Sequence, residues 1–135
     1  MGFRRKMKDV ELVNYIEIKR QAPFAWGVCD CVLFVCDWCE VITGVNPAEG
    51  AHGEYDSELS AYKYLKKQYG NDPAKYIDKH FERVDPNFAQ IGDICLCDLD
   101  GKDTFGICGK GGFVFFKSDT LIARKIEKKI IWRVE

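Results

Sequence analysis

The chain has 135 residues, of which 47% are hydrophobic and 30% charged, which is typical of one globular domain and excludes a disordered chain. Its 20 basic and 21 acidic residues almost balance, so no nucleic-acid-binding face is expected, and no apolar run is long enough to span a membrane. We predict a single domain over residues 1–135, with a flexible basic segment at 1–8.

Two helices are predicted in the first third of the chain. Asp9 can cap a helix over residues 10–20, which has an apolar stripe. Asp30 can cap a second helix over residues 31–43, and Gly44 is placed to end it. Because this second helix is apolar on most faces, we expect it to lie at the centre of the fold.

Two further helices are predicted before the pattern changes. Ser57 can cap a helix that runs to residue 69, and Pro73 can open a short helix through residue 79. On the first of these, residues at helical spacing are expected to face inward: Tyr62, Leu65 and Tyr69.

From residue 81 onward the hydrophobic period changes to two, which predicts strands. The aromatic residues Phe113, Phe115 and Phe116 would point to both faces of the sheet, which suggests that another subunit covers one face. Helices followed by strands indicate an α+β fold, with N-terminal helices packed on a C-terminal antiparallel sheet of about five or six strands. The expected strands cover residues 81–84, 94–99, 104–108, 113–117, 121–126 and 130–134.

The stretch from Phe24 to Cys31 carries the clearest chemistry. Trp26 and Gly27 lie in a loop that leads to Asp30 and Cys31 at the start of the second helix. A helix N-terminus carries partial positive charge and free N–H groups, which would lower the pKa of a thiol and hold an oxyanion. Cys31 is therefore a candidate nucleophile. The alternative is a buried structural thiol beside a plain N-cap.

Motifs across nearly the whole chain resemble those of the NlpC/P60 superfamily, which comprises papain-like cysteine peptidases and amidases. These motifs are Trp26-Gly27, Asp30-Cys31, Asp37-Trp38, Thr43-Gly44, Tyr55, Gly92-Asp93, Gly106-Ile107 and Trp132. The resemblance is closest to a small phage- and prophage-associated branch of unknown function. It implies a papain-like fold with a central helix that starts at Cys31, and no cofactor. It also implies incorporation in a virion, with other phage structural proteins or a cell-wall peptide as partners.

One departure from that family bears directly on activity. Active members carry a histidine in the strand after Gly-Asp, and Thr104 stands at that position here. Threonine cannot take a proton from a thiol near neutral pH. The chain has two histidines, His52 and His80. His52 is the preferred substitute base, because its loop is expected to approach the cleft.

Two functions therefore remain open. The first is a non-catalytic or degenerate NlpC/P60-like domain that serves as a structural or interaction component of a phage particle or tail. In that case Trp26, Gly27, Asp30 and Thr104 shape the former site. The second is an active cysteine hydrolase, a peptidoglycan peptidase or amidase, that uses Cys31 with a non-standard base. The missing histidine favours the first.

Seven cysteines are many for this length, and their odd number argues against a secreted disulfide scaffold. We expect free thiols that pack as small hydrophobic residues, in a protein made in a reducing cytoplasm. A zinc site is disfavoured because Cys36 and Cys39 lie inside a predicted buried helix, whereas zinc ligand pairs usually lie on turns. No metal is expected.

Overall fold

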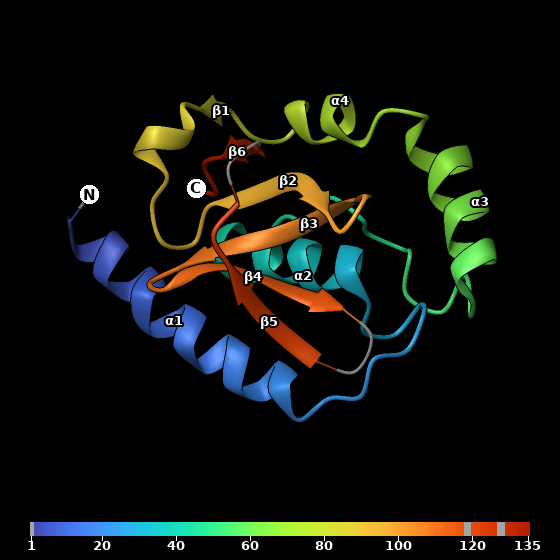
Figure 1. Cartoon of the computed structure of the whole chain (residues 1–135), viewed down its shortest axis with the longest axis horizontal. Helices are drawn as coiled ribbons and strands as arrows, with labels where there is room; N and C mark the ends of the chain where they lie inside the picture. Colours follow the sequence, from blue (N-terminus) through green and yellow to red (C-terminus); the bar gives the residue numbers. More distant parts are fainter. Residues whose placement is uncertain (1, 118–119, 127–128) are drawn as a thin grey trace.

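Helices occupy the first half of the chain and strands the second, which confirms the predicted α+β class (Figure 1). The computed structural model describes residues 2–117, 120–126 and 129–135. Its helices are α1 (Gly2–Arg20), α2 (Cys31–Thr43), α3 (Glu58–Tyr69) and α4 (Pro73–Asp78), with a 3₁₀ turn at Pro86–Phe88. Its strands are β1 (Arg83–Val84), β2 (Ile94–Leu99), β3 (Lys102–Gly109), β4 (Gly112–Lys117), β5 (Thr120–Arg124) and β6 (Lys129–Trp132).

The described strands form one antiparallel sheet in the order β1-β6-β2-β3-β4-β5. From β2 to β5 the chain runs as a meander, in which each strand pairs with the next. The β2–β3 hairpin turns on Asp100 and Gly101, whose φ angles of 56° and 86° correspond to a type I′ turn. The strand β6 is inserted between β1 and β2, so the last strand of the chain joins the interior of the sheet.

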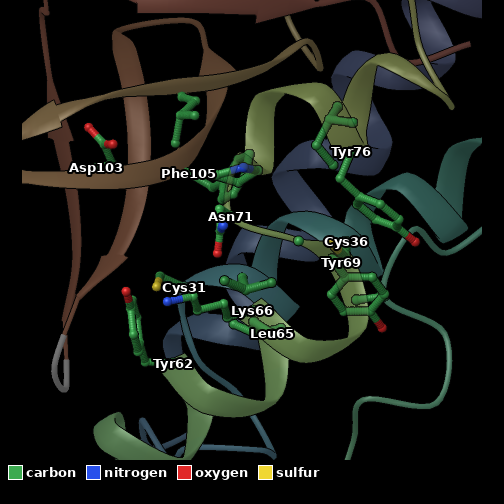
Figure 2. Close-up of a pocket in the computed structure, with 16 residues that line it drawn as sticks. Cys31, Cys36, Tyr62, Leu65, Lys66, Tyr69, Asn71, Tyr76, Asp103 and Phe105 are labelled. Atoms are coloured by element: carbon green, nitrogen blue, oxygen red, sulfur yellow. The ribbon is translucent and has the colours of Figure 1, made fainter.

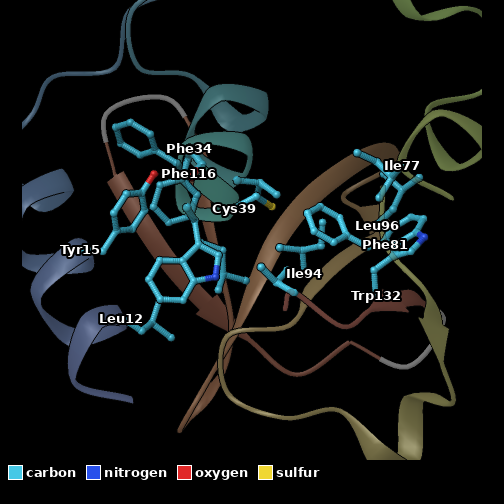
Figure 3. Packing of buried hydrophobic residues seen from close by; sticks show 14 of the residues in the cluster. Leu12, Tyr15, Phe34, Cys39, Ile77, Phe81, Ile94, Leu96, Phe116 and Trp132 are labelled. Carbon is cyan, nitrogen blue, oxygen red and sulfur yellow. Dashed lines mark hydrogen bonds between the residues drawn. The ribbon is translucent and has the colours of Figure 1, made fainter. Parts of the chain in front are cut away.

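The helix α2 forms the centre of the core, as its apolar faces predict. Leu33, Phe34 and Trp38 have no exposed surface. The ring of Tyr15 on α1 contacts the rings of Phe34 and Trp38 in tilted arrangements, with ring centroids 5.5 and 5.4 Å away. Figure 3 shows Tyr15 and Phe34 in the core together with Leu12 and Phe116. The indole N–H of Trp38 donates to the carbonyl of Gly92 at 2.9 Å, which ties the helix to the start of β2.

The opposite face of the sheet is covered by the chain itself. Phe113 and Phe115 are buried there in a second cluster with Cys95 and Ile131. The ammonium group of Lys129 on β6 lies 4.7 Å from the ring centroid of Phe113 on β4. These strands are three positions apart, about 14 Å in a flat sheet, so the contact shows that the sheet curls. The predicted covering by another subunit therefore loses its basis.

The first helix begins earlier than predicted. It starts at Gly2, so the basic segment expected to be flexible is helical over residues 2–8. Asp9 accordingly lies within the helix and not at its N-cap. The reason is that arginine, lysine and methionine favour helices, and no proline interrupts this segment.

Asp93, directly before β2, has no exposed surface and links the start of this strand to the segment after β6. Its Oδ1 accepts a hydrogen bond from Nε of Arg133 at 2.9 Å, and its Oδ2 accepts one from the backbone N–H of Gln90 at 2.7 Å. Burial raises the pKa of Asp93, while the positive charges of Arg133 and Lys8 oppose that rise. Asp93 is therefore a structural carboxylate whose ionised form is stabilised by the positive charge of Arg133.

We expect Arg133→Met to destabilise the protein by about 3 kcal/mol near pH 7, because a buried carboxylate then lacks its partner. A carboxyl whose folded pKa is raised contributes stability below its unfolded pKa and loses it as pH rises through the folded pKa. The effect of Arg133→Met should therefore shrink toward about pH 3.5, which urea unfolding at both pH values would test. Arg20→Met, at an exposed site, is the control. An equal loss at both pH values would contradict this account.

Candidate functional site

The loop before Cys31 is fixed by Asp30, whose side chain has no exposed surface. Two of its hydrogen bonds are N-cap contacts to the first turn of α2, one is made within its own loop to Gly27, and one ties that loop to the neighbouring loop at residues 45–57. All four hydrogen bonds of this carboxylate therefore stabilise the loop and the helix. Asp30 thus fixes the position of Cys31 and does not bind a ligand. The four donors, at 2.8 to 3.1 Å, are the N–H groups of Val32, Leu33 and Gly27 and the hydroxyl of Tyr55.

Gly27 lies where these two loops touch. Its φ is +81°, and a Cβ built on it would lie 1.9 Å from the backbone oxygen of Tyr55. Its own carbonyl accepts a hydrogen bond from the N–H of Gly53 at 2.8 Å. The neighbouring Trp26 packs edge-on against Phe24, with ring centroids 5.0 Å apart. Trp26 and Gly27 thus hold the loop, and neither lines the pocket beside Cys31.

Cys31 is the first residue of α2 and opens onto a pocket of about 460 Å³, which we call the cysteine pocket (Figure 2). The pocket lies between α2, α3, α4 and the strands β2 and β3. Figure 2 shows Cys31, Tyr62 and Lys66 at one end and Tyr69 and Tyr76 at the other. The wall is mainly apolar and aromatic, and its charged or amide side chains are Lys66, Asn71 and Asp103.

The electrostatics of Cys31 differ from the prediction. Burial is the largest effect and raises the pKa of the thiol to about 12, and the nearby carboxylate of Asp30 adds to the rise. The backbone N–H groups of Cys31 and Val32 act in the opposite direction, but burial outweighs them. The predicted low pKa is therefore wrong, because it considered the helix N-terminus and not the loss of solvent.

The structure brings neither histidine to Cys31. Nε2 of His52 lies 3.0 and 3.1 Å from the two carboxylate oxygens of Asp37. Asp37 follows Cys31 by six residues on α2, which places it about 9 Å away along the helix axis. His80 follows α4, where its ring contacts Tyr76. Among the described residues that line the cysteine pocket, there is no histidine.

The strand β3 reaches the cysteine pocket through Asp103 and Phe105 and not through Thr104. Side chains alternate along a strand, so Thr104 belongs to the other face. Its hydroxyl donates to the carbonyl of Lys102 at 3.0 Å. The sequence-based prediction does not include Asp103. The period-two pattern around Phe105, a large aromatic residue, could have placed Asp103 on the inward face.

Tyr62 and Lys66 are also absent from the predicted site. The prediction that Tyr62 faces the core is wrong, since its side chain is 63% exposed and Ala61 occupies the buried position of α3 instead. The ammonium group of Lys66 lies 5.7 Å from the ring centroid of Tyr62, a cation–π contact at the rim of the pocket. Nothing in the one-dimensional pattern distinguishes such a rim residue from an ordinary exposed lysine.

We expect Cys31 to react slowly with iodoacetamide near pH 7 and progressively faster toward about pH 12, because the thiolate is the reactive form. Pulsed labelling with peptide-resolved mass spectrometry measures this rate. Cys31→Ser identifies the labelled peptide, and a cysteine in an unstructured peptide, with a pKa of about 8.5, is the reference. A rate for Cys31 that levels off at or below the pH of the reference would contradict the raised pKa.

All seven cysteines are free. Within residues 2–117, 120–126 and 129–135, no group of three or more His, Cys, Asp or Glu side chains is arranged to hold a metal ion. No helix in those ranges has the length and apolar character needed to cross a bilayer.

Comparison with known proteins links the chain to a family. Residues 4–134 match a family described as a domain of unknown function, DUF6950. Neither the curated proteins nor the solved structures contain a match to the chain. The family match spans the helices and the sheet alike, so it includes the loop held by Asp30 and the whole cysteine pocket. Function therefore has to be inferred from the geometry of these residues.

Proposed function

The chain belongs to the DUF6950 family of domains of unknown function, and we propose that it is a non-catalytic, NlpC/P60-like domain that binds a partner. On this proposal the papain-like arrangement is retained as a scaffold, and the protein is a structural or interaction component of a phage particle or its tail. The phage context rests on the motif resemblance. The non-catalytic role rests on one observation, the chemical state of Cys31 in its pocket.

A cysteine hydrolase needs a thiolate, or a base within hydrogen-bond reach of the thiol. With a pKa of about 12, only about one Cys31 in 10⁵ is ionised at pH 7. Neither histidine lines the cysteine pocket in the described part of the chain. The thiol therefore stays protonated, and no histidine among the described lining residues is placed to protonate a leaving group.

The cysteine pocket is nevertheless built like a binding site. Its volume of about 460 Å³ lies within the usual range of ligand sites. Tyrosine rings and aliphatic side chains form most of its wall, and a few polar groups lie among them. Such a lining can hold an apolar side chain of a partner and orient it by hydrogen bonds, which is the role expected of an interaction domain.

The test is incubation of the purified protein with peptidoglycan stem peptides, followed by mass spectrometry of the products. We expect no cleavage above that of Cys31→Ala, over a pH range from about 5 to 9. An established cysteine hydrolase in the same assay shows that the substrates are competent. Cleavage that Cys31→Ala abolishes would disprove the non-catalytic role.

The alternative is an active cysteine hydrolase, which one observation favours. Cys31 occupies the first position of a helix, opens onto a ligand-sized pocket, and has backbone N–H groups directed at its sulfur. Among the described lining residues, the charged groups that could then assist it are Lys66 and Asp103. On this alternative, Lys66→Met or Asp103→Asn would abolish Cys31-dependent cleavage, whereas His52→Ala would leave it unchanged.

A further inference from the structure

A second groove, away from the cysteine pocket, runs between α1 and β5. It has a volume of about 720 Å³, and no residue lines both it and the cysteine pocket. One wall is α1, which contributes Val10 and Val13, and the other is formed by β5 and the β3–β4 turn. Figure 1 shows α1 lying alongside β5 at the outer edge of the sheet. We call this the edge groove.

The strand β5 presents an open edge to this groove. It pairs with β4 on one side, and among the described residues no strand pairs with its other side. Alternate residues of such a strand direct their N–H and C=O groups outward, where they can pair with an added strand. The groove-lining part of β5 is Leu121-Ile122-Ala123. This part carries none of the charges or prolines that usually block edge pairing.

The helix wall of the groove mixes polar and aliphatic side chains, and two of its valines are exposed. The side chains of Val10 and Val13 are each 62% exposed, although both line the groove. They lie three residues apart on α1 and therefore share one face of the helix. Two aliphatic side chains beside an open strand edge provide a contact surface for the side chains of a paired segment.

Asp9 is a charged residue of the edge groove that favours a basic occupant. It lines the groove one turn before Val13. Its Oδ1 is buried and has no hydrogen-bond partner among the described residues. A buried carboxylate oxygen without a donor is unfavourable. A cationic side chain that enters the groove would relieve this, so the occupant should be basic at this point.

We infer that the edge groove binds an extended segment of a partner protein, which adds to the sheet as a strand beside β5. Alternate aliphatic side chains of that segment lie against Val10 and Val13, and a lysine or arginine reaches Asp9. Because α1 forms the other wall, the occupant lies between a helix and a strand. This suits one extended segment better than the edge of a second folded sheet. A second copy that paired through its β5 would bring Arg124 to the groove. This arginine is already paired with Asp100 of its own chain at 3.0 Å, so it is not available to Asp9.

The experiment selects binders from a displayed library of random peptides, using the full chain, and measures each synthetic peptide by fluorescence anisotropy. We expect sequences with alternating aliphatic residues and a lysine or arginine. Val13→Lys should weaken their binding at least about ten-fold. Ile18→Lys is the matched control, because Ile18 is similarly exposed at 67% on the same helix but does not line the groove. Circular dichroism confirms that both variants are folded.

Two further readouts separate strand addition from simple apolar binding. The peptide is N-methylated at every second residue in two phases, one at the odd positions and one at the even positions. One phase should abolish binding and the other preserve it, because only alternate N–H groups pair with β5. Replacing the basic residue of the peptide with norleucine should weaken binding to the wild type, but not to Asp9→Asn.

Three results would overturn the inference. The first is a library selection in which Val13→Lys weakens the binding of none of the selected peptides. The second is equal loss of binding in both N-methylation phases. The third is a dimer of the peptide-free protein that Val13→Lys dissociates in light scattering, since that would assign the groove to a second copy. None of these readouts depends on the cysteine pocket, so the outcome is independent of the proposed function.

Discussion

Gly27→Ala should destabilise the protein by more than about 3 kcal/mol, whereas Gly44→Ala should cost about 1 kcal/mol. Both glycines have a left-handed backbone, with φ of +81° and +80°. They differ in what an added methyl group meets. At Gly44 no atom lies within 4 Å, whereas at Gly27 the backbone oxygen of Tyr55 lies 1.9 Å away.

The Tyr55 backbone cannot easily move away from such a methyl group. The Tyr55 hydroxyl donates to Asp30 at 2.8 Å, and the N–H of Gly53 donates to the carbonyl of Gly27 at 2.8 Å. The clash therefore separates the two loops and breaks these hydrogen bonds. Urea unfolding of both variants measures the difference, and Gly44→Ala isolates the cost of the backbone conformation alone. Equal losses in the two variants would show that the close approach to Tyr55 is not maintained.

Asp30→Ala should destabilise the protein by about 4 kcal/mol, because it removes an N-cap and leaves buried donors without an acceptor. Asp30→Asn, which keeps the shape, should cost about 2 kcal/mol, because an amide cannot accept on both sides. Tyr55→Phe removes one of the four donors and should cost about 1 kcal/mol. The order of these three losses is the prediction, and chemical unfolding measures it.

The same variants bear on Cys31. The Asp30 carboxylate contributes to the raised pKa of the thiol, so Asp30→Asn should lower that pKa if the loop stays closed. Iodoacetamide labelling of Cys31 would then accelerate at a lower pH than in the wild type. A loss for Asp30→Ala no greater than that for Tyr55→Phe would mean that water replaces the missing carboxylate. The loop would then not be held by Asp30.

Local signals predicted the elements well where the determinants lie close together in the sequence. The predicted limits of α2 and α3 are confirmed, because Asp30 and Ser57 cap their N-termini and Gly44 and Gly70 follow their C-termini. The strands predicted over 104–108 and 113–117 are likewise present as β3 and β4, which pair through a short glycine-rich turn.

Non-local features could not be predicted in this way. The position of β6 between β1 and β2 depends on pairing across nearly fifty residues from β1. The curl of the sheet, which buries Phe113 and Phe115, depends on the same long-range contacts. No periodicity in one strand encodes either feature.

In the candidate site, too, the local features could be predicted and the non-local ones could not. Cys31 at the start of α2 follows from the N-cap signal and is confirmed as the first residue of the helix. Its pKa depends on burial beneath α3 and β3, which the sequence around Cys31 does not contain. The pairing of His52 with Asp37 likewise joins two segments whose separation in space was unknown.

The insertion of β6 in the sheet has a consequence for the order of folding. The meander from β2 to β5 needs only contacts between successive strands, so it can form early. The strand β1, by contrast, pairs with β6 and with no other described strand, and one edge of β2 is likewise completed by β6. Until residues 129–132 are synthesised, β2 therefore presents an open and strongly apolar edge. The nascent chain is therefore exposed to aggregation until these residues are available to pair with β2.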